Sequence, residues 1–165
     1  MRTIKIFDHG DYDPTWPICK RDSARAIIFI GDQLLMVRSA KYGEYKFPGG
    51  GIEPDESHHA TLQREVKEET GYTINIDTIA EYGRTLILRK STTPHEIFEQ
   101  ESFYYICAIA PQAATAPTPD AGYEQEYGYA PALVTPAEAI ATNEQRLHLP
   151  QIPWVQRDTT VLRAL

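Results

Sequence analysis

The sequence predicts an α/β domain in which helices cover both faces of a mixed β-sheet. Two apolar runs around a turn signal indicate a β-hairpin, later segments alternate as strands do, and three further segments carry helix boundaries or helical apolar spacing. Strands that interleave with helices are typical of this class. The chain has 165 residues, of which 42% are hydrophobic, so we expect residues 1–165 to form a single domain with one buried core.

A β-hairpin is predicted over Ala24–Arg38, which reads ARAIIFIGDQLLMVR. Its two apolar, partly β-branched runs flank Gly31 and Asp32, a pair that favours a tight turn. A polar stretch then leads into three consecutive glycines at positions 49–51. Glycines permit positive φ and let the main chain approach a ligand closely, so this segment is either an ordinary tight turn or part of a binding site.

A helix is predicted from Ser57 to Thr70. Leu62 and Val66 lie four residues apart and would face inward, and Gly71 supplies a C-terminal stop signal.

The second half of the chain is predicted to complete the sheet and to add two helices. Residues 111–120 are rich in Ala, Pro and Thr and have no periodic apolar face, so we expect an exposed, mobile loop. Thr135, Pro136 and Glu138 form a capping-box pattern at the start of a helix, and a last helix is expected at 153–164. The expected strands of this part are 72–79, 82–88, 102–109 and 132–134.

Charged residues and glycines recur at fixed spacings around the first predicted helix. The segment from Gly50 to Tyr72 reads GGIEPDESHHATLQREVKEETGY. Glu65, Glu68 and Glu69 share one side of the helix, where like charges four residues apart destabilise it by roughly 0.2–0.5 kcal/mol per pair. A divalent cation would neutralise these charges, so the spacing predicts a metal site.

This segment resembles the Nudix box, in which a Gly, five residues, a Glu and seven residues precede Arg-Glu-aliphatic-any-Glu-Glu-any-Gly-aliphatic. Eight of the nine defined positions match, and the departure is Tyr72, where the family usually has Ile, Leu or Val. The resemblance implies the Nudix α/β/α sandwich, with the box in a loop-helix-loop. It also implies hydrolysis of a phosphoanhydride bond in a nucleoside diphosphate linked to another group.

A metal-binding set follows from the same resemblance. Mg²⁺ is the first choice because it is a hard cation that prefers oxygen ligands at about 2.0–2.1 Å, and Mn²⁺ is the expected substitute. For Arg64 and Glu68, the competing interpretation is a solvent-exposed helix salt bridge of little worth. The implied set is Glu65, Glu68, Glu69 and the carbonyl of Gly49 as metal ligands, Glu56 as a supporting or additional ligand, and Arg64 as the residue that orients its neighbours.

The general base is left open between the box and a distant loop, because Nudix enzymes differ in which of them supplies it. Glu65 is the candidate in the box, and Glu126 is the candidate in the loop before the last predicted strand. Glu124, Glu101 and Glu99 are further alternatives. For each of the four residues outside the box, an ordinary surface carboxylate is the competing interpretation.

Substrate contacts are predicted outside the box. Arg38 is a candidate to hold a phosphate through its fork of donors, and the alternative is a solvent-facing strand residue. Tyr45 and Phe47, together with Tyr82 and Arg84, are candidates to stack on a base, although aromatic residues in strands more often belong to the core.

Charge and composition narrow the classes of partner. The net charge of −7, from 23 acidic and 16 basic residues, argues against a broad nucleic-acid-binding surface. It does not indicate the substrate, and the Nudix resemblance implies a small nucleotide as the partner. No stretch resembles a secretory signal or approaches the roughly 20 apolar residues of a membrane span, so we expect a cytoplasmic protein.

Cys19 and Cys107 lack metal-site spacing and are expected to be incidental thiols. A homodimer, as many small Nudix proteins form, is left open.

The favoured substrate is a (deoxy)nucleoside triphosphate or an oxidised nucleotide, by similarity to small MutT-like members of the family. ADP-ribose or another nucleotide sugar is the enzymatic alternative. A non-catalytic Nudix-like module that senses a nucleotide is the alternative of a different class. Such modules commonly lose carboxylates of the box, and this chain retains all of them.

Overall fold

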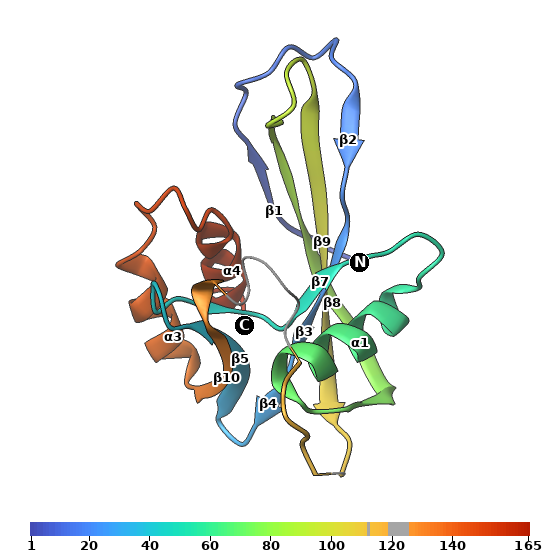
Figure 1. Cartoon of the computed structure of the whole chain (residues 1–165), viewed down its shortest axis with the longest axis vertical. Coiled ribbons are helices and arrows are strands. Elements are labelled where there is room, and N and C mark those ends of the chain that lie inside the picture. The colour runs from blue at the N-terminus through green and yellow to red at the C-terminus, as the bar shows by residue number, and fades with distance from the viewer. Residues whose placement is uncertain (112, 119–125) are drawn as a thin grey trace.

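The computed structural model describes residues 1–111, 113–118 and 126–165, which fold around two β-sheets with helices on either side (Figure 1). The predicted α/β class is thereby confirmed. None of the described helices is long and apolar enough to cross a lipid bilayer. The elements are β1 (Thr3–Asp8), β2 (Ile18–Lys20), β3 (Ser23–Ile27), β4 (Phe29–Ile30), β5 (Gln33–Ser39), β6 (Tyr45–Lys46), β7 (Gly49–Gly51), α1 (His58–Thr70), β8 (Ile74–Lys90), β9 (Ile97–Ile109), β10 (Tyr129–Val134), α3 (Pro136–Glu144) and α4 (Trp154–Leu162).

The larger sheet is mixed, with the strand order β1-β8-β9-β3-β7, and β2 pairs with the first residues of β9. Strands β8 and β9 form an antiparallel hairpin, whereas β1 runs parallel to β8 and β3 runs parallel to β9. The far half of this hairpin, flanked by β1 and β2, projects beyond the rest of the molecule at the top of Figure 1. The sheet therefore offers a long face on which a ligand site can be built.

Two details of this sheet differ from the prediction. The strands expected at 72–79 and 82–88 are one strand, β8, with register shifts between Asn75 and Ala80 and between Glu81 and Gly83. Strands β1 and β2 were not predicted. Residues 3–6 of β1 do alternate between polar and apolar types, but the alternation is short, and β2 consists of three exposed residues with no such pattern.

The predicted hairpin at 24–38 is divided between the two sheets. Strands β4 and β5 pair antiparallel around the expected turn, but β3 pairs with β9 and β7 in the mixed sheet. The expectation of a single mixed sheet is corrected accordingly, because β10, β5, β4 and β6 form a second, antiparallel sheet. Ile27 and Ile28 are both fully buried at the division, so the apolar pattern carries no sign that the chain changes sheets there.

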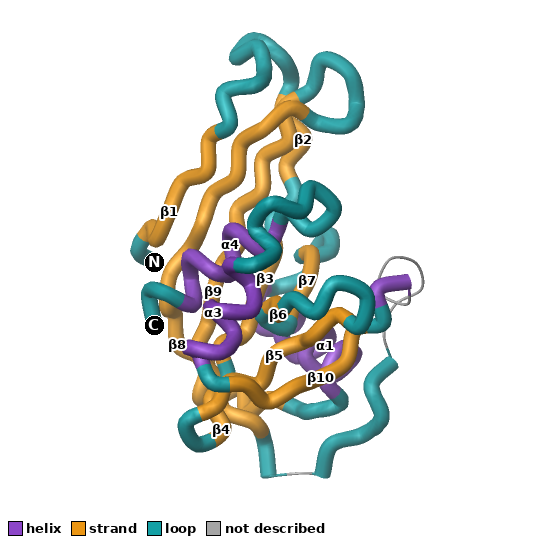
Figure 2. The backbone as a smooth tube through the Cα atoms, turned by 90° about the vertical axis from the view of Figure 1, so that its left-hand side faces the viewer, coloured by secondary structure: helices purple, strands orange, loops and turns teal. Residues whose placement is uncertain are grey.

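Helices cover opposite faces of the mixed sheet. Leu62 and Val66 of α1 pack with Ala24 and Ala26 of β3, as the helical spacing predicts, whereas α4 packs on the side of Ile27. Figure 2 shows α3 and α4 next to each other.

The predicted helix ends are confirmed. The hydroxyl of Ser57 accepts a hydrogen bond from the Ala60 amide at the start of α1, and Gly71 ends the helix with φ 75°. At the start of α3, Thr135 and Glu138 form the expected capping box.

The loop expected at 111–120 is described at residues 113–118, which are exposed and have no regular secondary structure. The amides of Thr115 and Thr118 donate to the carbonyls of Gly71 and Glu68 at the end of α1. Mobility of this loop remains a prediction.

The two cysteines are expected to react very differently with a thiol reagent. Cys19 is exposed, whereas Cys107 is buried, and burial raises the pKa of its thiol to about 12. The thiolate is the reactive form of cysteine. At pH 8 the folded protein should therefore release about one equivalent of 2-nitro-5-thiobenzoate from 5,5′-dithiobis(2-nitrobenzoate), and the unfolded protein should release two. A Cys19→Ser variant is the control and should show no fast phase. Equal rates for both thiols in the folded protein would contradict the buried position of Cys107.

Candidate active site

The three glycines form β7 and bring the backbone against α1 and β3. Gly49 has φ 135°, and a side chain there would place its Cβ 2.2 Å from the carbonyl oxygen of Ala24. A Cβ on Gly50 would lie 2.1 Å from Oε1 of Glu65. These two glycines are therefore required by the close approach of a neighbouring strand and of a helix carboxylate, and the alternative of an ordinary tight turn does not describe them.

Arg64 gathers three carboxylates around one guanidinium. Its Nε and Nη2 donate to Glu56 at 2.9 and 2.8 Å, and its Nη1 donates to Glu65 at 2.7 Å and to Glu68 at 3.3 Å. Its Nη2 also lies 3.3 Å from the carbonyl oxygen of Gly51. Arg64, Glu56, Glu65 and Glu68 are called the Arg64 cluster below. Arg64 and Glu68 therefore do not form the isolated surface salt bridge considered above, because Arg64 also contacts Glu56 and Glu65.

The surroundings of Glu56 and Glu65 shift the pKa values of these two carboxyl groups in opposite directions. The hydrogen bonds from Arg64 hold the pKa of Glu56 down at about 2, so Glu56 stays ionised at neutral and mildly acidic pH. Burial instead raises the pKa of Glu65, and the nearby Arg64 opposes this effect.

Glu69 pairs with a second cation of the chain. Its side chain is 2% exposed, and it forms an ion pair with Lys46 at 2.7 Å. Its Oε2 accepts a hydrogen bond from the amide of Gly49 at 2.8 Å. The carbonyl of Gly49 in turn accepts from the guanidinium of Arg25. The Arg64 cluster and Glu69 therefore both contact β7, and the carboxylates of each are neutralised by a cation of the chain itself.

The donor set fits a hard divalent cation in kind, because the side chains and the Gly49 carbonyl offer only oxygen atoms. The carboxylates point toward Arg64 and Lys46, however, and no three His, Cys, Asp or Glu side chains of the described chain converge on one point. Binding a metal therefore calls for side chains such as Glu65 and Glu68 to turn away from these cations.

The candidate bases outside the box have other partners. Glu126 is exposed and pairs with Lys41, and Glu101 pairs with Arg84 at 2.6 Å. Glu99 belongs to β9, where it lies opposite Lys20 of β2. Glu124 lies outside the described residues.

The predicted substrate residues lie on or next to strands of the antiparallel sheet. Arg38 is exposed on β5, with its guanidinium 5.8 Å from the centre of the Tyr45 ring on β6, so both belong to the antiparallel sheet. Phe47 is fully buried, and its ring packs edge-on against Tyr104 at 5.6 Å. Its predicted role in stacking on a base is corrected to a core residue, because the ring has no exposed surface.

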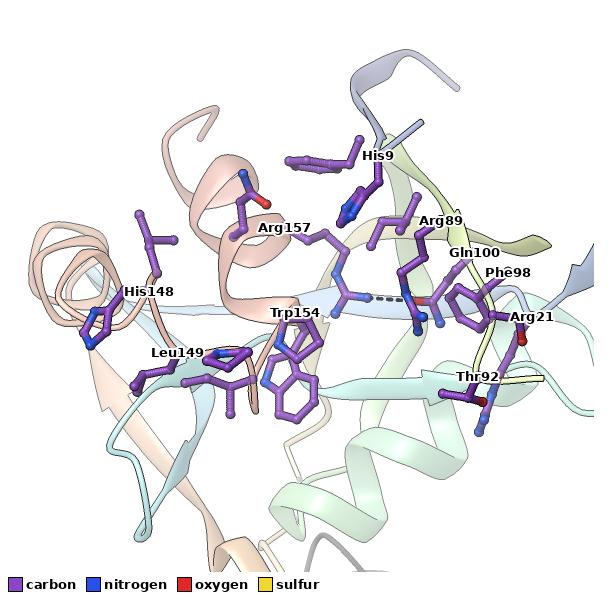
Figure 3. Close-up of a pocket in the computed structure, with 18 residues that line it drawn as sticks. His9, Arg21, Arg89, Thr92, Phe98, Gln100, His148, Leu149, Trp154 and Arg157 are labelled. Atoms are coloured by element: carbon purple, nitrogen blue, oxygen red, sulfur yellow. Dashed lines mark hydrogen bonds between the residues drawn. The ribbon is translucent and has the colours of Figure 1, made fainter. Parts of the chain in front are cut away.

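A cavity of about 650 Å³ lies between the mixed sheet and α4, and sequence reasoning did not find it (Figure 3). Arg21, Arg89, Phe98, Trp154 and Arg157 are among its lining residues. These side chains come from β8, β9, α4 and the segment between β2 and β3, with no shared spacing. Only the pairing of distant strands brings them together, so the sequence contains no motif for this cavity.

Comparison with known proteins identifies the family. A sequence model described as the NUDIX domain matches residues 20–157. The human protein named nucleoside diphosphate-linked moiety X motif 6 is 33% identical over 94 residues, which make up 57% of this chain and 26% of that protein. The chain thus spans about a quarter of the length of this relative.

Solved structures agree in fold. A NUDIX hydrolase from Nitrosomonas europaea superposes with a TM-score of 0.56 at 21% identity, covering 85% of this chain and 88% of that one. The Bacillus subtilis pyrophosphohydrolase BsRppH superposes with a TM-score of 0.50 at 22% identity, covering 78% and 68%. These likenesses agree with the predicted Nudix sandwich, and because the domain match covers most of the sequence, the chain belongs to the NUDIX family.

Proposed function

We propose that this protein hydrolyses a phosphoanhydride bond in a nucleoside diphosphate linked to another group, with Mg²⁺ as the cofactor and Mn²⁺ as a substitute. The observation that carries the proposal is the Arg64 cluster, which holds three carboxylates beside the glycine strand β7. Cleaving such a bond with water requires an activated nucleophile and neutralisation of the charge on the phosphate oxygens. The name of the human relative, nucleoside diphosphate-linked moiety X motif 6, supports the same substrate class.

The residues have separate tasks in this proposal. Glu65, Glu68 and Glu69 would hold the metal with the Gly49 carbonyl, and Glu56 would support or join them. When bound, the metal would lower the pKa of a water molecule and neutralise phosphate charge. Arg64 positions the carboxylates, since its guanidinium contacts three of them directly.

We favour Glu65 over Glu126 as the general base. Glu65 lies inside the Arg64 cluster, whereas the Glu126 side chain is 63% exposed and pairs with Lys41. Glu65→Gln should therefore lower kcat strongly and remove the acidic limb of the pH-rate profile. Glu126→Gln should keep that limb and stay within about threefold of the wild-type rate, because an exposed ion pair contributes little. The reverse pattern in the two profiles would assign the base to Glu126.

The substrate that we favour is a (deoxy)nucleoside triphosphate or an oxidised nucleotide. The decisive test is a panel of nucleoside triphosphates, oxidised nucleotides, ADP-ribose, nucleotide sugars and dinucleotide polyphosphates, incubated with the protein and Mg²⁺ while released phosphate or pyrophosphate is measured. Preference for ADP-ribose or a nucleotide sugar would replace the favoured substrate. Absence of turnover with every member, together with tight nucleotide binding, would instead indicate a module that senses nucleotides.

A further inference from the structure

The cavity between α4 and the mixed sheet is large enough for a nucleoside. Its volume of about 650 Å³ lies within the range of roughly 300–1,000 Å³ that is usual for small-molecule sites. One wall carries Phe98 of β9, and the opposite side carries Trp154 at the start of α4 (Figure 3). Aromatic walls of this kind favour a planar ring system.

The charge of the cavity is opposite to that of the whole protein. The chain has a net charge of −7, yet no Asp or Glu among the described residues lines the cavity, while Arg21, Arg89 and Arg157 do. Arg157 is 3% exposed and is neutralised by the buried carboxylate of Asp158 at 2.9 Å. Arg21 and Arg89 form no ion pair with any carboxylate of the described chain, so their charges remain available to a ligand.

The charged side chains that line the cavity are arginines, which can only donate hydrogen bonds. The Oε1 atom of Gln100 accepts a hydrogen bond from Nη1 of Arg157 at 3.2 Å, as the dashed line in Figure 3 shows. This bond leaves the amide nitrogen of Gln100 as the end that is free to point elsewhere. The guanidinium of Arg89 lies over the ring of Phe98 at 4.3 Å, which fixes the plane of its donors. Such a lining selects a ligand that is anionic and rich in acceptors.

The cavity also adjoins the candidate active site. Nε of Arg21 is 3.7 Å from the position that a Cβ on Gly51 would occupy. The carbonyl of Gly51 in turn lies 3.3 Å from Nη2 of Arg64. A ligand that touches Arg21 at the edge of the cavity therefore has the Arg64 cluster as its neighbour on the other side of β7.

From this arrangement we propose that the cavity binds the nucleoside and the first phosphate of the substrate, an inference that rests on the proposed function. The base lies against Trp154, and Arg89 and Arg21 hold the phosphate. The rest of the phosphate chain then extends past Gly51 toward the carboxylates of α1. Arg21 and Arg89 are thus substrate-binding residues in place of Arg38.

The test measures nucleotide binding in EDTA, so that hydrolysis does not interfere. Isothermal titration calorimetry is run with AMP, GMP, CMP and UMP, with inorganic phosphate, and with the matching nucleosides. At least one monophosphate should bind more tightly than phosphate and than its own nucleoside. Arg21→Gln and Arg89→Gln should each weaken that binding by about tenfold or more, because each removes a charge-assisted contact. Arg21 is exposed, so its variant should fold normally even if Arg89→Gln loses stability.

A matched control variant and a fluorescence measurement show whether the monophosphate binds in the cavity. Lys90→Gln removes the same charge from the next residue of β8, whose side chain lies over Trp16 and does not line the cavity, so binding should be unchanged. In a Trp16→Phe background Trp154 is the only tryptophan, and its fluorescence should change on addition of the monophosphate.

Several results would overturn the inference. One is that no monophosphate binds. Another is that the Arg21→Gln variant binds the monophosphate as tightly as the wild type does, and a third is that Arg38→Gln weakens binding whereas Arg21→Gln does not. Turnover of a nucleotide with unchanged KM in both cavity variants would also reject the cavity while leaving the proposed function intact. Intact monophosphate binding without turnover of any substrate would count against the proposed function and support the binding site.

Discussion

Glu68→Gln is expected to lower kcat by about three orders of magnitude while leaving the fold intact. The substitution replaces a charged oxygen donor by a neutral amide of the same shape, which a hard divalent cation binds poorly. The Glu68 side chain is 31% exposed, and its ion pair with Arg64 is the longest of the three in the cluster at 3.3 Å. Its loss should therefore change the melting temperature little.

Two measurements check this prediction. Initial rates as a function of Mg²⁺ concentration give kcat, and calorimetric titration with Mn²⁺ gives metal affinity independently of turnover. Glu53→Gln is the control, since it makes the same change at an exposed position of the loop before α1. Wild-type Mn²⁺ affinity and wild-type kcat in Glu68→Gln would remove Glu68 from the metal site.

Gly50→Ala is expected to lower the rate by about a hundredfold in a protein that still folds. The new methyl group would occupy the place of the Glu65 carboxylate, whose Oε1 lies 2.1 Å from the Cβ position. That carboxylate is the end of a flexible side chain, so it can move aside, and a displacement of about 1 Å at a reacting group is enough for such a loss. The helix and strand need not separate.

The neighbouring glycines supply the comparison. A Cβ on Gly51 has Nε of Arg21 as its nearest contact at 3.7 Å, so Gly51→Ala should keep near wild-type kcat. Gly49→Ala meets the backbone of Ala24 at 2.2 Å and needs an unfavourable φ, so it should damage folding itself. Melting curves and kcat for the three variants test this order. A fully active Gly50→Ala protein would show that the position of Glu65 is not critical.

The parts of the fold that the sequence predicted well have local causes. Helix α1 begins after Ser57, whose side chain accepts a hydrogen bond from the first turn, and ends at Gly71, which has a left-handed φ. Both signals involve only nearby residues. The capping box at Thr135 is equally local. The Nudix resemblance depends on spacings within one segment, and the match over residues 20–157 confirms the family that it indicated.

The parts that the sequence did not predict depend on long-range pairing. Ile28 marks a change of sheet inside an unbroken apolar run, and Phe47 is buried because Tyr104 of a distant strand packs on it. The position of Glu69 beside Lys46 likewise follows from the placement of β6 next to α1. Spacing along the helix predicted that the carboxylates share a side, but it carried no information about which cation each would meet.

The ion pairs around β7 have a consequence for how the protein matures. Arg64 and Lys46 already supply counter-ions to the acidic side of α1, so the charge repulsion that a bare cluster of carboxylates would create is relieved within the polypeptide. This region therefore folds without a bound metal, in contrast to small domains that fold only when a metal binds. An incoming cation has to exchange places with built-in positive charges, so metal supply would switch on catalysis in a protein that is already assembled.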